Sequence, residues 1–190
     1  LIGAEIMKIQ QVSNLETVMD WICAIQQIPA PTFNESQRAI FMHSEFSRLG
    51  MQDVHFDSTG NVLARWPGGS GSPLVVSAHL DTVHCDLTEI PLERTDQRIT
   101  GPAVADNSTG LAGLLFLACH LCEVKPSYAG DIWLAANVCE EGLGNLAGMK
   151  AVVEAFGAKP LAYLVLEGLG LGQICHRGLG VNRFKVTVET

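Results

Sequence analysis

Three apolar segments of this chain end within a few residues of a histidine or a carboxylate, and a fourth begins just after an aspartate. Short apolar runs bounded by turn residues are typical of strands buried in an α/β sheet. Ligands bind outside the carboxyl ends of the strands in such sheets. The sequence therefore predicts an α/β fold in which an imidazole and several carboxylates meet at one edge of the sheet.

The first segment, residues 74–76, leads into His79 and Asp81. Side chains two positions apart on a strand point to the same face. This spacing suits an imidazole that binds a metal while a neighbouring carboxylate fixes its orientation. A hydrogen-bonded pair at the end of a strand explains the same spacing, so this pair alone does not decide between the two interpretations.

Asp106 stands shortly before an apolar run, residues 111–118, that is long enough for a buried helix. We expect Asn107 or Ser108 to cap this helix, which places Asp106 at its mouth. A capping acid attracted by the helix dipole is the alternative to a metal ligand at this position.

Glu140 and Glu141 follow the expected strand 131–138, and Glu167 follows the expected strand 161–166. Two ionised carboxylates side by side in a cleft repel each other, and a nearby dication removes that cost. Together with His79 and Asp106, these acids form a mixed nitrogen and oxygen ligand set. Such a set suits zinc, with cobalt or manganese possible, and has room for two ions.

Three stretches, residues 77–83, 101–110 and 139–148, resemble motifs of the co-catalytic zinc exopeptidases and deacylases. That family includes glutamate carboxypeptidase, peptidase T, acetylornithine deacetylase, succinyl-diaminopimelate desuccinylase and aminoacylase. The motifs occur in the family's order, and the chain is similar to the family's amino-terminal catalytic half. The resemblance implies a three-layer α/β sandwich with a mostly parallel mixed sheet.

The resemblance also implies roles for six residues. His79 and Glu167 would bind one zinc, Glu141 would bind a second zinc, and Asp106 would bridge both. Asp81 would orient His79, and Glu140 would be the general base. The family further places a cis peptide after the bridging aspartate, which is the Asp106–Asn107 bond here.

For the domains, we expect residues 1–177 to form an incomplete catalytic metallopeptidase domain and residues 178–190 to form the first strand of a lid or dimerisation domain. A longer native protein is favoured over a naturally short one, because a lone lid strand exposes an unpaired edge. The longer protein is expected to be a homodimer. The chain alone is expected to hold at most one tightly bound zinc and to be inactive.

The expected activity is hydrolysis of a peptide or N-acyl amide bond in a small peptide or an acylated amino acid. With glutamate at position 167, the chain is similar to the carboxypeptidase and deacylase members of the family, whereas aminopeptidase-like members more often have aspartate there. The alternatives are a tripeptidase or aminopeptidase like peptidase T, and a non-catalytic truncated homologue. The retention of all six site residues argues against the non-catalytic alternative.

Composition narrows the class of protein further. The net charge of −8 argues against a nucleic-acid surface, and we find no uninterrupted apolar run long enough to cross a membrane. The cysteines lie mostly in apolar segments, which suits buried thiols in a reducing, cytoplasmic setting. Cys119 and Cys122 have the spacing of half a zinc knuckle, but a second such pair is missing and we expect them to pack.

The polar and apolar periodicity predicts the remaining elements. Helices are expected over residues 14–28, 34–49 and 146–156, a hairpin over 52–66, a surface loop over 67–73 and an irregular segment over 85–100. The first two helices each have a candidate capping box, Ser13 with Glu16 and Thr32 with Glu35, and Gly50 is expected to end the second helix.

Overall fold

A computed structural model describes residues 15–84, 89–168, 170, 172–178, 180 and 186–188. Within these residues the main sheet has five strands in the order β1 (Gln52–Phe56), β2 (Val62–Trp66), β6 (Ile132–Asn137), β3 (Leu74–His79) and β7 (Ala162–Val165). Strand β2 is antiparallel to both of its neighbours, whereas β3 pairs in parallel with β6 and β7. This confirms the predicted mixed, mostly parallel sheet.

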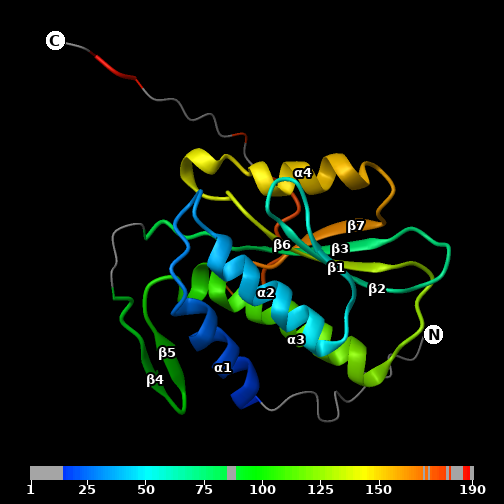
Figure 1. The fold of residues 1–190 in the computed structure, drawn as a ribbon, viewed down its shortest axis with the longest axis horizontal. Helices are drawn as coiled ribbons and strands as arrows, with labels where there is room; N and C mark the ends of the chain where they lie inside the picture. The colour runs from blue at the N-terminus through cyan, green and yellow to red at the C-terminus, as the bar shows by residue number, and fades with distance from the viewer. Residues whose placement is uncertain are drawn as a thin grey trace.

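Helices cover both faces of this sheet (Figure 1). Helices α1 (Leu15–Gln26), α2 (Ser36–Leu49) and α3 (Gly110–Val124) pack on one face through the larger apolar core. Helix α4 (Ala147–Phe156) packs on the other face, where Val152 joins a smaller core with Val75 and Ala135. The predicted three-layer sandwich is therefore confirmed.

Of the two predictions about the ends of α2, one is correct and one is wrong. Gly50 adopts a left-handed conformation with φ of 96°, and its N–H donates to the last turn of the helix, as predicted. The predicted capping role of Thr32 is wrong, because the helix begins without a side-chain cap. The Thr32 hydroxyl donates to the Asp81 carboxylate instead, at 3.0 Å. The box predicted at Ser13 lies outside the described residues.

Helix α3 is the central apolar helix of the core. The assigned N-cap, Thr109, makes no side-chain cap, but Asn107 Oδ1 accepts the Gly110 N–H at 2.9 Å and so supplies the predicted capping oxygen. By length and hydropathy alone, the stretch Val104–Val124 could cross a membrane, but 56% of its 18-residue apolar window is buried inside the protein. Its backbone is also non-helical at Asp106 and Asn107. These features are those of a core helix.

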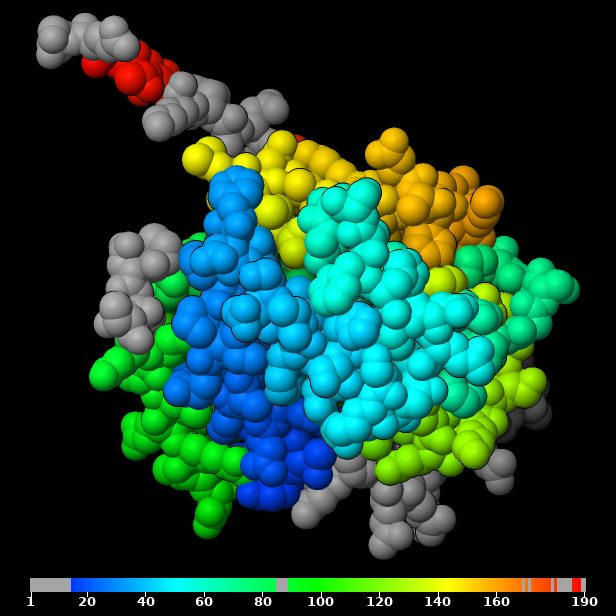
Figure 2. All heavy atoms as spheres, in the orientation of Figure 1, coloured from blue at the N-terminus to red at the C-terminus, as the bar shows by residue number. Residues whose placement is uncertain are grey.

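The segment expected to be irregular contains a second, two-stranded sheet. Strands β4 (Glu93–Thr95) and β5 (Arg98–Thr100) form an antiparallel pair, so the prediction of an irregular segment is wrong in this part. The Arg94 guanidinium pairs with Asp20 at 2.6 Å and with Glu16, both on α1. The hairpin consequently lies against α1, as the green and blue atoms of Figure 2 show.

The other short elements are a distorted helical turn, Val104–Thr109, before α3, and a 3₁₀ turn, Gly142–Gly144, before α4. The strand predicted after residue 177 falls mostly on residues outside the described set. The described cysteines are free thiols, and Cys175 is exposed rather than buried as expected. Cys119 and Cys122 contact Glu123 and Met51, which agrees with a packing role.

Candidate metal centre

His79 is the last residue of β3, next to the carboxyl ends of β6 and β7, and is almost fully buried. Its Nδ1 lies 3.0 Å from the backbone oxygen of Asp81. Because a carbonyl can only accept, Nδ1 carries the proton and the lone pair of Nε2 is free in the neutral imidazole. That lone pair faces Asp106 Oδ1 at 2.8 Å and Glu167 Oε2 at 3.7 Å.

The Asp81 carboxylate has a wider role than the sequence indicates. It is fully buried, and its two oxygens accept the N–H groups of Glu140 and Glu141, each at 2.9 Å. It also accepts the Thr32 hydroxyl, while its Oδ1 is 3.5 Å from His79 Nδ1. Burial is the largest influence on its pKa and raises it, but these hydrogen bonds outweigh burial and hold the pKa low. Asp81 therefore orients His79 through its own backbone carbonyl. Its carboxylate fixes the backbone of Glu140 and Glu141.

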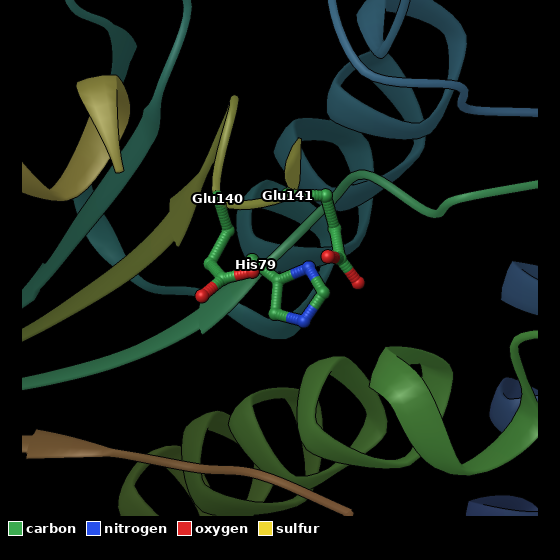
Figure 3. A group of neighbouring side chains, drawn as sticks. All are labelled: His79, Glu140 and Glu141. Atoms are coloured by element: carbon green, nitrogen blue, oxygen red, sulfur yellow. The ribbon is translucent and has the colours of Figure 1, made fainter. Parts of the chain in front are cut away.

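Glu140 and Glu141 approach His79 from two sides, as Figure 3 shows. Consecutive side chains on an extended strand point to opposite faces, so a regular continuation of β6 would separate them. Cys139, which follows the strand closely, adopts a left-handed conformation with φ of 54° and so turns the chain away from a regular continuation of β6. One ligand atom from each of His79, Glu140 and Glu141 then lies within 4.8 Å of the others.

Asp106, in the turn before α3, and Glu167, just after β7, reach the same imidazole. The Asp106–Asn107 peptide is cis, in agreement with the expectation from the resemblance. The Asn107 side chain donates to the Leu166 carbonyl at 2.9 Å and thereby joins the Asp106 turn to the strand end that carries Glu167. His79, Asp106 and Glu167 make a second group whose ligand atoms lie within 4.8 Å of one another. In the described part of the chain, both candidate metal groups contain His79.

The charges at this site are unbalanced without a cation. Burial, which is the largest influence, raises the pKa of Glu140, Glu141 and Glu167, and the neighbouring carboxylates raise it further. Burial lowers the pKa of His79, but Asp81 and the surrounding carboxylates outweigh it and raise that pKa to about 9. Without a metal ion, the positive charge of the protonated His79 imidazole therefore stands against the negative charges of several carboxylates.

The side chains fit a divalent metal ion. Asp106 Oδ1 is a buried carboxylate oxygen that accepts no hydrogen bond within the described chain, and it lies 2.8 Å from His79 Nε2, whose lone pair is free when the imidazole is neutral. A buried acceptor without a donor is costly, and a metal ion between these two atoms would satisfy both. One imidazole and several carboxylates are ligands that zinc accepts.

Three polar residues around the site, of which Glu35 and Arg38 are buried, were missed by sequence reasoning. Thr32 binds Asp81, Glu35 binds the Cys139 backbone, and Arg38 donates to the Leu80 carbonyl at 2.8 Å. Burial lowers the pKa of Arg38 to about 10, and its charge interacts with Asp81. The sequence spacing of Thr32 and Glu35 predicts a local capping box, and α2 gives no sequence signal that Arg38 turns inward.

Comparisons with known proteins show relatives of this chain in sequence and in fold. Succinyl-diaminopimelate desuccinylase from Corynebacterium glutamicum is 30% identical over 164 residues, which are 85% of this chain and 44% of that protein. The solved structure of aminopeptidase PepT from Bacillus cereus has a TM-score of 0.70 at 23% identity, covering 84% of this chain and 45% of that one. A dinuclear metal-binding peptidase from Bacillus subtilis has a TM-score of 0.61 at 14% identity, covering 80% and 42%.

The chain therefore spans less than half the length of these relatives. The two structural likenesses establish the fold. A sequence model of peptidase family M20/M25/M40 matches residues 75–188, more than half of the chain, and this stretch contains all six residues that the motifs singled out. The match, together with a sheet edge where one histidine faces carboxylates from three other segments, makes this chain a member of peptidase family M20/M25/M40.

Proposed function

We propose that the full-length protein is a metal-dependent hydrolase of peptide or N-acyl amide bonds in small substrates. The observation that carries the proposal is the position of His79 Nε2, 2.8 Å from the buried Asp106 Oδ1, with Glu167, Glu140 and Glu141 around it. His79, Asp106 and Glu167 would hold one ion, and Asp106 and Glu141 would share a second. A zinc ion held there would lower the pKa of a bound water and polarise the scissile carbonyl.

Glu140 is the proposed general base. Its side chain lies beside His79, and its backbone N–H is fixed by Asp81 at 2.9 Å, so its position does not depend on substrate. Burial and the neighbouring carboxylates raise its pKa towards the pH at which it would work. Glu140 would take one proton from the attacking water and pass it to the leaving amine.

The proposed substrates carry a free carboxylate next to the bond that is cleaved. Two observations support this choice over a free amino terminus. The residue at the end of β7 is Glu167, which the family resemblance associates with carboxypeptidases and deacylases. The similarity of this chain to a desuccinylase, at 30% identity, also favours an N-acyl substrate.

A substrate comparison with the full-length zinc-loaded protein tests the proposal. We expect N-succinyl and N-acetyl amino acids, including N-succinyl-diaminopimelate, to be hydrolysed faster than tripeptides with a free amino terminus. Chelator treatment should remove this activity, and added zinc or cobalt should restore it. A preference for tripeptides would contradict the substrate class, and the absence of turnover on every substrate would contradict the enzymatic function.

A further inference from the structure

Glu35 is a buried carboxylate at the start of α2 that the catalytic scheme leaves unused. Its exposed fraction is 5%, and a carboxylate so placed is costly unless hydrogen bonds satisfy it. Its Oε1 accepts the N–H of Phe33 and the N–H of Cys139, each at 3.0 Å. The Cys139 thiol is a further donor at 3.5 Å. This acid therefore joins two chain segments that are more than 100 positions apart.

The contact with Cys139 occurs at the turn that presents the two catalytic-site glutamates. The three consecutive N–H groups of residues 139, 140 and 141 all donate to buried carboxylates, the first to Glu35 and the other two to Asp81. Cys139 is held in the left-handed conformation, which is unfavourable for a residue other than glycine. The Glu35 hydrogen bond opposes relaxation of this residue to an extended conformation.

The other side of the turn is also fixed. The Cys139 carbonyl accepts the Ala147 N–H at 3.1 Å, from the first residue of α4. Burial, followed by the charge of Glu35, raises the pKa of the Cys139 thiol to about 11, so the thiol remains a donor at neutral pH. Glu35 and the start of α4 thus clamp Cys139 between them.

The loop that carries Glu35 is attached to the metal site independently. Thr82 donates its N–H to the Ala30 carbonyl at 2.9 Å, and Thr32 donates to Asp81 at 3.0 Å. Pro31 and Thr82 form an isolated parallel bridge. The loop is consequently fixed to the end of β3, where His79 lies, while Glu35 reaches across to the end of β6.

We infer that Glu35 is a positioning residue, which sets the place of Glu140 and Glu141 relative to His79 by holding the Cys139 turn. The inference rests on the proposed function, because the two glutamates matter through the metal and the water. This role requires that the Glu35 oxygen reaches the Cys139 N–H, and the negative charge of Glu35 alone does not suffice.

Two conservative variants of the full-length protein separate reach from charge. Glu35→Asp keeps the charge but draws the oxygen back from the Cys139 N–H, whereas Glu35→Gln keeps an acceptor at the same reach without the charge. We expect Glu35→Asp to weaken zinc binding and to lower kcat at least tenfold, within the 10–100-fold range of outer-shell residues, with KM changed less than threefold. Glu35→Gln should stay within threefold of wild type in both measurements.

Glu45→Ala is the matched control. Glu45 is on the same helix and accepts hydrogen bonds from Trp21 and Arg48, away from the metal site. Its loss should lower the Tm without changing zinc affinity. Zinc affinity is measured by calorimetric titration without substrate, so a wild type that turns over nothing would refute the proposed function and still leave the Glu35 comparison decisive. A Glu35→Asp variant within threefold of wild type in zinc affinity, or a Glu35→Gln variant as weak as Glu35→Asp, would overturn the inference.

Discussion

Glu140 and Glu141 have different expected duties although they are adjacent and both lie near His79. The Glu141 carboxylate is expected to bind metal, and the Glu140 carboxylate is expected to move a proton. Their backbone N–H groups are bound in the same way by the two oxygens of Asp81, so the difference resides in the side chains. A substitution that changes only the side-chain chemistry of Glu140 can therefore test its duty without disturbing the turn.

We expect Glu140→Gln to lower kcat by about 10²–10⁴-fold, the usual contribution of a general acid–base group, because an amide cannot accept the proton. Zinc affinity should stay within threefold of wild type, since the amide has nearly the same size and the Asp81 hydrogen bond to the backbone persists. Steady-state kinetics and zinc titration of the full-length protein measure both. The exposed Glu154, on α4, provides the control substitution Glu154→Gln. Retention of more than a tenth of wild-type kcat by Glu140→Gln would exclude Glu140 as the base.

At the scale of elements, the apolar periodicity is sufficient to predict the strands of the main sheet and the helices that cover it. Strands β3 and β6 are mostly buried apolar runs whose ends lead to site residues, so their pattern predicts both the sheet and the edge at which His79 meets the acids. The prediction that the run before Glu167 is a buried strand is wrong, because β7 lies at the edge of the described sheet and Leu164 and Val165 are exposed. The β4–β5 hairpin escaped prediction because it is polar and is held by surface ion pairs from Arg94 to α1.

The residues around the site escaped prediction for a different reason. A threonine and a glutamate three positions apart before a helix predict a local capping box. In the folded chain both side chains serve distant partners, Asp81 and Cys139, which no local pattern can indicate. Long-range hydrogen bonds of this kind become visible only when the tertiary structure brings the segments together.

Asn107 joins the two elements that bring Asp106 and Glu167 to His79. Its Oδ1 caps α3 at Gly110, and its Nδ2 holds the end of β7. A Cβ at Gly110 would overlap Asn107 Oδ1. We therefore expect Gly110→Ala to displace Asn107, to weaken zinc binding at least tenfold and to cost about 1–3 kcal/mol of stability through the unpaired polar groups. Thermal unfolding and zinc titration measure the two effects.

Gly113→Ala is the matched control on the same helix. A Cβ at Gly113 would lie 3.2 Å from the flexible end of the Leu166 side chain, and alanine is favoured over glycine inside a helix by about 1 kcal/mol. This variant should keep its zinc affinity and lose little stability. Equal losses of zinc affinity in Gly110→Ala and Gly113→Ala would show that Asn107 does not join the two elements.

For the whole molecule, the charge at the metal site links pH to stability. Five of the twenty acidic residues, Asp81, Asp106, Glu140, Glu141 and Glu167, surround His79. The folded, metal-free chain raises the pKa of His79 from 6.5 to about 9, so it binds that proton more tightly than the unfolded chain does. The resulting stabilisation is complete below pH 6.5 and is lost as the pH rises through 9. The pKa values of Glu140, Glu141 and Glu167 are also raised, so the contribution of these groups to stability likewise falls as the pH rises above 4.5.

The free energy of unfolding of the metal-free protein should therefore fall between pH 6.5 and pH 9, by at most about 3 kcal/mol from His79. A protein of this size loses roughly 2–4 °C of Tm per kcal/mol. Bound zinc takes the place of the Nε2 proton, so with saturating zinc this decline should vanish or reverse. Thermal unfolding at several pH values, with chelator and with zinc, measures both slopes, and His79→Gln should abolish the decline seen with chelator. A metal-free Tm that rises from pH 6.5 to pH 9 would contradict the charge balance described for this site.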